Sequence, residues 1–250
     1  MNSNKNFQFE VTPSELRWLA EVLGYVRFPL FNIPKNNESE MDLVEELKIA
    51  QATIQERGLA APLPGFGWQV ERLIVALTQL IANPDFVQVL QIWFKDGTRR
   101  RAFIYPNNDL PLLVEVGDVL QFTLHSDLHE LNTQKQDFSN LPPKFAVAQT
   151  SFQFPMPGQS QSLAWNSSEK FSISNMMDTL GSDRWEGLLG QMTTMGVITD
   201  LGSTEDGFEI RDQKSLFWNK KNIWGGSVMA GGVVDFPPLS HAQALALLWN

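Results

Sequence analysis

The first pattern along the chain is an amphipathic helix with a well-marked beginning and end. The stretch TPSELRWLAEVLG places Thr12 as N-cap, Pro13 at the first helical position and Glu15 three residues after the cap. This is a capping box combined with a proline start. Apolar residues then recur every three or four positions, and Gly24 provides a natural C-terminal stop. The pattern predicts a helix over 12–24.

Two further stretches repeat the helical spacing. Residues 39–58 predict a second amphipathic helix, with Ser39 as the cap, Asp42 at the box position and Gly58 at the end. A third helix is predicted over 68–84, with an apolar stripe that ends before Pro84. The stripe consists of Val70, Leu73, Ile74, Leu77, Leu80 and Ile81.

From residue 86 the apolar pattern changes to that of short β-strands. The run FVQVLQIWF is aromatic and β-branched, and Asp96-Gly97 follows it, which is a strong hairpin signal. The returning strand, two more strands and a short closing helix are predicted over 99–106, 110–116, 119–125 and 126–134.

The second half repeats this order less clearly. A strand is expected within 144–154, followed by a loop rich in Pro, Gly, Ser and Gln. Helices are expected over 172–181 and 182–196, a turn over 200–207, strand-like runs over 208–212, 215–219 and 222–236, and a final helix over 240–249.

These elements predict an α+β fold with two similar halves, each made of helices, an antiparallel strand meander and a short helix. The expected halves are 1–140 and 171–250, joined by a connecting segment, 141–170. The similar ends of the halves suggest an ancient duplication and a quasi-two-fold arrangement around a central sheet. One integrated domain is the alternative.

Composition excludes several classes of chemistry. The 250 residues include no cysteine and carry a formal net charge of −9. Disulfides, thiolate catalysis and cysteine-ligated metals are therefore excluded. The acidic balance argues against general nucleic-acid binding and against docking on anionic lipid. No run approaches the length of a membrane span and no signal peptide is visible, so we expect a cytoplasmic protein.

The basic run at 95–101 is the strongest local charge feature. Lys95, Arg99, Arg100 and Arg101 crowd around the Asp-Gly turn. Successive side chains of a strand point to opposite faces, which opposes the convergence that a phosphate clamp needs. We expect a charged hairpin tip, with contact to an acidic partner as the alternative.

Motifs for catalysis or ligand binding are weak. His125 and His129 have helical spacing but no evident third metal ligand, so no metal site is expected. The glycine-rich stretch 225–232 fits neither a P-loop nor a dinucleotide-binding motif. We expect a protein without enzymatic activity or cofactor. Two alternatives stay open: a small-ligand protein or enzyme with a site near 225–232, and a regulatory nucleic-acid binder using 171–201 and the arginine hairpin.

Aromatic residues on the predicted strands provide candidates for partner binding. A protein-binding site needs exposed apolar surface with a polar rim. A sheet packed on helices explains the same aromatic density and is the favoured interpretation. The candidate partner-binding residues are Trp218, Trp224, Met229, Phe103 and Tyr105.

The order of elements resembles the EspG family, the cytosolic chaperones of type VII (ESX) secretion. The likeness is carried by the capped helix VTPSELRWLAEVLG, by AQATIQERGLA ending in Arg-Gly-Leu, and by the arginine-bearing strand pair that follows Asn83-Pro84. It covers mainly 10–130, and more loosely 170–250. The resemblance implies a quasi-two-fold α/β fold without catalytic residues. It also implies binding of a secreted helical client of the PE–PPE type and its delivery to the secretion machinery.

Overall fold

The computed structural model describes residues 7–25, 40–94, 96–141, 152–155, 193–204, 207–227 and 233–249. The helices are α1 (Pro13–Leu23), α2 (Glu40–Glu56), α3 (Arg72–Ala82), α4 (Leu128–Ser139) and α7 (His241–Trp249). The strands are β1 (Phe7–Val11), β2 (Ala60–Leu63), β3 (Gly67–Val70), β4 (Phe86–Phe94), β5 (Arg99–Tyr105), β6 (Leu112–Val116), β7 (Leu120–Leu124), β8 (Phe152–Pro155), β9 (Thr194–Thr204), β10 (Gly207–Trp218), β11 (Ile223–Ser227) and β12 (Val233–Phe236).

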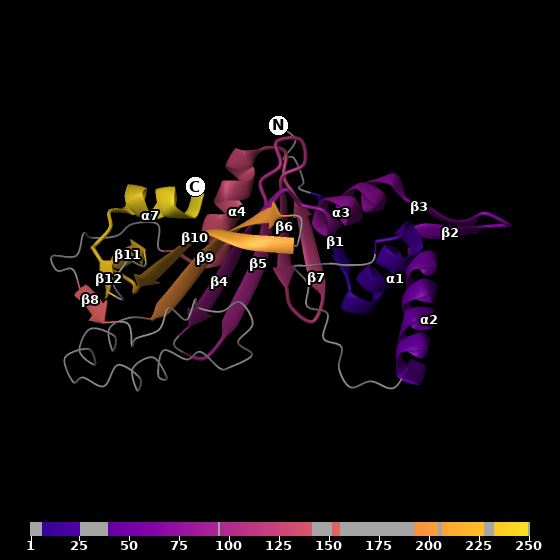
Figure 1. The fold of residues 1–250 in the computed structure, drawn as a ribbon, viewed down its shortest axis with the longest axis horizontal. Helices are drawn as coiled ribbons and strands as arrows, with labels where there is room; N and C mark the ends of the chain where they lie inside the picture. Colours follow the sequence, from indigo (N-terminus) through magenta and orange to yellow (C-terminus); the bar gives the residue numbers. More distant parts are fainter. Residues whose placement is uncertain are drawn as a thin grey trace.

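An eight-stranded antiparallel sheet organises the chain, in the order β1-β7-β6-β5-β4-β9-β10-β11 (Figure 1). Strand β4 pairs along its whole length with β9, from Phe86 opposite Gly202 to Phe94 opposite Thr194. Strands of both sequence halves therefore lie in one sheet. The α+β fold expected from the sequence is confirmed.

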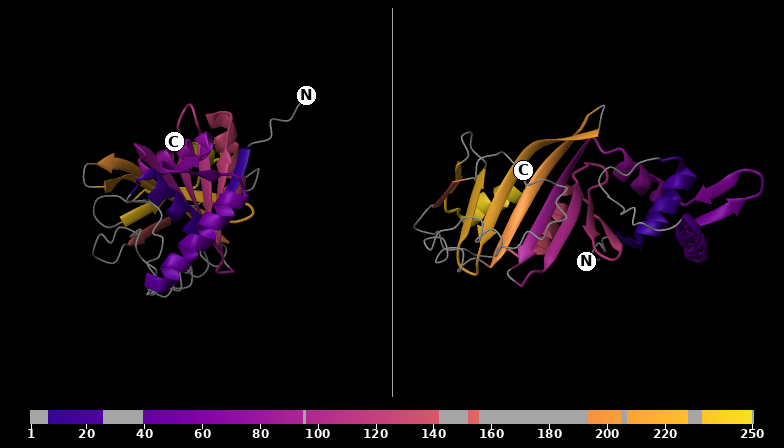
Figure 2. Two further views of the ribbon diagram at one scale, coloured as in Figure 1. Left: turned by 90° about the vertical axis from the view of Figure 1, so that its right-hand side faces the viewer. Right: turned by 60° about the horizontal axis from the view of Figure 1, so that its bottom comes forward.

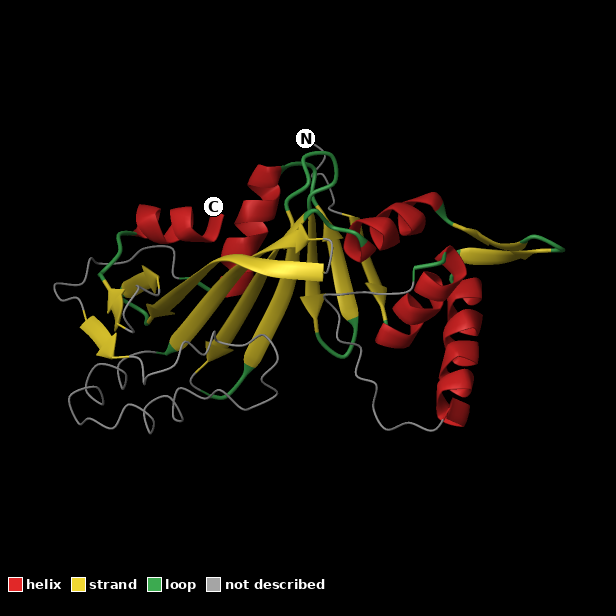
Figure 3. Ribbon diagram, in the orientation of Figure 1, coloured by secondary structure: helices red, strands yellow, loops and turns green. Residues whose placement is uncertain are grey.

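Helices cover the two faces of the sheet at different places (Figure 3). On one face, α1, α2 and α3 pack on the strands of the first half, with Val89, Phe103 and Phe122 among the buried strand residues. On the opposite face, α4 and α7 pack against a second core that includes Leu90, Ile104 and Leu216 from three strands. Alternation along the strands produces this division, since neighbouring residues such as Phe103 and Ile104 point to opposite faces.

The first helix begins as the sequence predicts. The Thr12 hydroxyl accepts a hydrogen bond from the Glu15 N–H at 3.1 Å, and the Glu15 carboxylate accepts one from the Thr12 N–H at 2.7 Å. Gly24 ends the helix with φ of 77°. Gly58 also has a left-handed φ of 70°, just after α2. The expected cap at Ser39 lies outside the described residues.

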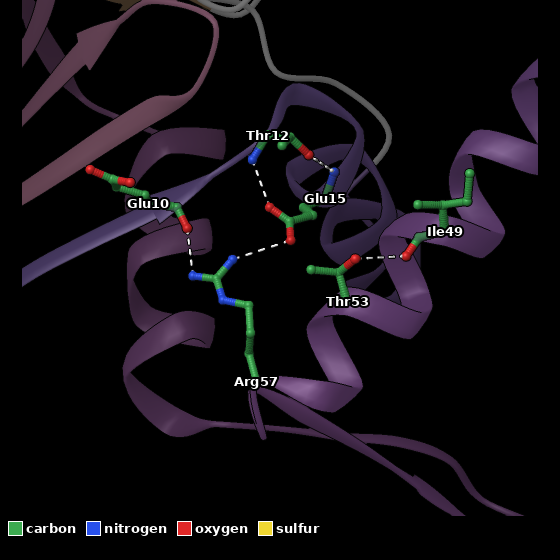
Figure 4. A network of polar contacts seen from close by, with 6 residues as sticks. All are labelled: Glu10, Thr12, Glu15, Ile49, Thr53 and Arg57. Carbon is green, nitrogen blue, oxygen red and sulfur yellow. Dashed lines mark hydrogen bonds and ion pairs between the residues drawn. The ribbon is translucent and has the colours of Figure 1, made fainter.

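Arg57, directly after α2, joins three elements (Figure 4). Its guanidinium donates to the Glu15 carboxylate at 3.1 Å and to the Glu10 carbonyl of β1 at 2.6 Å. It also lies 5.3 Å from the centre of the Phe9 ring. The Arg-Gly-Leu segment thus connects the end of α2 to α1 and to the edge of the sheet.

Several sequence expectations were wrong, among them the separate runs 208–212 and 215–219, which form the single strand β10. Strand β1 was not expected, and neither was the hairpin of β2 and β3, so α3 begins at Arg72 rather than at 68. The expected helix end at 194–196 and part of the expected turn at 200–207 belong instead to β9. Strand β9 is buried on both faces, which removes the period-two alternation that identifies a half-buried strand.

Candidate partner-binding surface

The Asp-Gly hairpin between β4 and β5 has the expected turn geometry. Gly97 has a φ of 86°, and its N–H donates to the Phe94 carbonyl at 2.9 Å. The Asp96 carboxylate accepts from the Thr98 N–H at 2.8 Å, which lowers the pKa of Asp96. Lys95 lies outside the described residues. The turn is therefore held by local bonds, and β5 begins with its three arginines directly after it.

Arg100 points to the face of the sheet covered by α4 and has a packing role. Its guanidinium donates to the Glu115 carboxylate at 3.0 Å and to the Phe138 carbonyl at 2.9 Å. It also stacks 4.2 Å from the centre of the Phe138 ring. These contacts hold the end of α4 against β5 and β6, so Arg100 has a role within the fold.

Arg99 and Arg101 point to the other face, as the strand alternation predicts. Arg99 lies exposed with its guanidinium 5.3 Å from the centre of the Trp93 ring on β4. Burial lowers the pKa of both arginines, and the charge of Arg99 lowers the pKa of Arg101 further. Two cations therefore lie close enough to repel each other, beside an aromatic ring. We call Trp93, Arg99 and Arg101 the arginine face.

Four of the five candidate partner-binding residues of the sequence analysis are buried. Phe103 and Tyr105 lie in the core beneath α1–α3, while Trp218 packs in the second core and Trp224 is buried on β11. Met229 lies outside the described residues. The expected exposure of these four residues is thus corrected, because elements distant in the sequence pack over the strands that carry them. Their role in partner binding stays an untested prediction.

The glycine-rich stretch begins with a packing glycine. A Cβ atom added to Gly225 would come within 2.5 Å of Leu239 and 2.9 Å of Leu216. Gly225 therefore lets α7 and the segment before it approach the sheet closely, as glycines within strands often do. Residues 228–232 lie outside the described residues.

The two histidines do not share a helix. His125 directly follows β7, two residues before the N-cap Asp127, whereas His129 is exposed on α4. Burial lowers the pKa of His125. In the part of the chain that the structure describes, no group of three histidine or carboxylate residues could hold a metal ion.

A buried polar cluster lies between α4 and the sheet. The Gln88 side-chain amide donates to the Asp200 carboxylate at 2.8 Å, which links β4 to β9. Lys135 of α4 is buried nearby, and this burial lowers its pKa to about 8, although the Asp200 charge opposes the shift. The charge of Lys214 lowers the pKa of Lys135 further. The cluster therefore places the ionisable side chains of Lys135 and Asp200 in the interface between α4 and the sheet.

Comparisons with known proteins show a likeness of fold. No family model matches the chain, and no curated protein is similar to it in sequence. Fourteen chains of solved structures match. One is the Mycobacterium tuberculosis type VII secretion system chaperone EspG5 in complex with a PE25–PPE41 dimer. The match has a TM-score of 0.60 and 11% identity, and covers 97% of this chain and 93% of that chain.

This match confirms the resemblance to the EspG family as a structural one. It extends over nearly the whole chain, and so includes the second half, where the sequence likeness was loose. Among the described helices, none is long and apolar enough to cross a lipid bilayer.

Proposed function

We propose that this chain is a cytoplasmic, non-enzymatic chaperone or adaptor that binds another protein and guides a secreted helical client to a type VII secretion system. The observation that carries the proposal is the structural likeness to EspG5 over nearly the full length of both chains. That neighbour is itself a chaperone in complex with a protein dimer.

The arginine face is the proposed contact for an acidic part of the client. Arg99 is exposed beside Trp93, an arrangement that offers both a charge and an aromatic surface. A client carboxylate would form charge-assisted hydrogen bonds with the exposed guanidinium of Arg99. Charge at such a surface contributes to selection of the partner as well as to affinity.

The test is affinity purification of the tagged protein from its native cell, with Arg99→Glu beside the natural chain. Co-purification of a secreted helical protein, reduced by Arg99→Glu, is the expected result. Arg72→Glu is the matched control, because Arg72 is exposed at the start of α3 and the charge change is the same. Equal client recovery with Arg99→Glu and with the natural chain would show that the arginine face does not bind the client. Recovery of no client at all would count against the chaperone function.

A further inference from the structure

The segment that joins β7 to α4 carries a buried histidine. The backbone N–H of His125 donates to the Pro111 carbonyl at 2.9 Å, which continues the β6–β7 ladder one pair beyond Leu112 and Leu124. Leu124 packs in the first core, so strand alternation directs the next side chain, that of His125, to the opposite face of the sheet. Helix α4 lies against that face (Figures 1 and 2), so His125 is on the side of the sheet that α4 covers.

The surroundings of the His125 ring favour the neutral imidazole. The residue is 6% exposed, and its two ring nitrogens are buried without a hydrogen-bond partner among the described residues. An imidazolium has two N–H donors, and burying a charge whose donors are unsatisfied is costly. Burial accordingly lowers the pKa of His125. The packed position of α4 therefore disfavours protonation of the ring beneath it.

The negative charges that act on His125 belong to the cap of α4. The carboxylate of the N-cap Asp127 accepts a hydrogen bond from the Glu130 N–H at 2.8 Å, and the Glu130 carboxylate accepts one from the Ser126 N–H at 3.1 Å. The charges of Glu130 and Asp127 raise the pKa of His125 and so oppose the larger effect of burial. Both carboxylates would attract an imidazolium, but both are already bonded to the backbone at the start of the helix.

The sheet beneath α4 brings no further charge to this position. The sheet residues beside His125 on the same face are uncharged, and they are Pro111, Leu113 and Thr123. Lys135, the other buried base of α4, interacts instead with the charges of Asp200 on β9 and Lys214 on β10. The two carboxylates of the cap are therefore the groups that a protonated His125 would seek.

We propose that the first turn of α4 is a pH switch, in which protonation of His125 breaks the cap made by Asp127 and Glu130 and releases the start of the helix from the sheet. In the released state the imidazolium is in water and pairs with the carboxylates that formed the cap. The end of α4 stays in place, because Arg100 donates to the Phe138 carbonyl and stacks on the Phe138 ring. The switch goes beyond the proposed chaperone function and does not depend on it.

The direction of the pH effect follows from the lowered pKa of His125. An exposed imidazole has its ordinary pKa of 6.5, so the released helix start binds a proton more readily than the packed one does. The packed state is therefore fully favoured above pH 6.5, and it loses stability as the pH falls through 6.5 toward the lower pKa of the packed ring. The equilibrium constant for opening should rise about five- to tenfold from about pH 7.5 to about pH 5.5, where ordinary carboxyl groups are still ionised.

Hydrogen exchange of backbone amides, measured by NMR on the full-length chain, tests the switch. Protection factors, which are corrected for the intrinsic pH dependence of exchange, should fall about five- to tenfold over this range for the N–H groups of Glu130 and Leu131. The internal control is the Glu15 N–H, which donates to the Thr12 hydroxyl in the cap of α1, at the other end of the paired strands β1 and β7. Its protection factor should change less than about twofold.

Two histidine variants assign the effect to one ring. His125→Phe removes the titrating group and keeps an aromatic ring, so the protection factors at the start of α4 should no longer depend on pH. His129→Phe is the matched control, because His129 is exposed on the same helix, and it should keep the pH dependence of the natural chain.

Three results would overturn the switch. One is constant protection of the α4 start in the natural chain, and another is a pH dependence that persists in His125→Phe. The third is an NMR titration of the natural His125 ring with its midpoint at or above the ordinary 6.5, a measurement that decides the matter even if His125→Phe does not fold. Because no client is present, these outcomes are independent of the chaperone function proposed above.

Discussion

The β4–β5 and β2–β3 hairpins differ in whether neighbouring strands cover their edges and in how much charge they carry. The β4–β5 hairpin lies in the middle of the sheet, has a partner strand on each side, and carries its charges at the turn and just after it. The β2–β3 hairpin has no further strand in the described structure and no charge at all. Exposed strand edges are normally protected by charge. Here the charge lies on the hairpin whose edges are already covered.

The contrast separates residues that hold the fold from residues available for binding. In the central hairpin, Phe103 and Arg100 have their contacts within the chain. In the β2–β3 hairpin, Phe66 is exposed to water at a turn between Gly65 and Gly67. Exposure in the folded chain, rather than aromatic character in the sequence, therefore indicates which aromatic residues can contact a partner.

The largest expected effect is the difference in free energy of unfolding between two Phe→Ala substitutions, one in each hairpin. Phe103→Ala should lower the free energy of unfolding by about 3–5 kcal/mol, because it leaves a cavity beneath α1–α3. Phe66→Ala should change it by less than about 0.5 kcal/mol, because the ring is in water. Urea unfolding of both variants measures these changes. Similar losses for the two variants would contradict the distinction between the hairpins.

The next largest effect is the pH dependence of stability that the buried Lys135 of α4 should produce. Its folded pKa of about 8 is below the ordinary value of 10.5, so the unfolded chain binds more protons between these pH values. Stability should therefore rise with pH from about 8 to about 10.5, by about 2–3 kcal/mol relative to Lys135→Met. Urea unfolding of both proteins at several pH values measures it. Parallel pH profiles for the two proteins would show that burial does not lower the pKa of Lys135 in the folded chain.

The smallest effect distinguishes two adjacent arginines of β5. Arg100→Met should destabilise the chain by about 1–2 kcal/mol, since it removes the half-exposed pair with Glu115 and the bond to the Phe138 carbonyl. Arg99→Met should cost less than about 0.5 kcal/mol, because that side chain is exposed. Thermal unfolding of the two variants provides the comparison. If Arg99→Met were the more damaging, Arg99 would belong to the fold and not to a binding surface.

The candidate site was predicted only in part. The alternation of Arg99, Arg100 and Arg101 follows from strand periodicity, and it correctly divided the three charges between two faces. The same reasoning could not tell that Trp218 and Phe103 are covered, since cover depends on elements distant in sequence. The β2–β3 hairpin was missed because Val70 fits the apolar spacing of the helix that follows it.

The sequence by itself determined the local structure: the capped start of α1 at Thr12, the Asp-Gly turn and the run of strands β4 to β7. These depend on contacts within a few residues, whose chemistry is written in order along the chain. Only the tertiary structure decided that β4 pairs with β9, that Arg57 reaches Glu15 and that Phe66 has no cover. Such contacts depend on which distant surfaces meet, and hydrophobic patterning specifies that a face is buried without specifying what covers it.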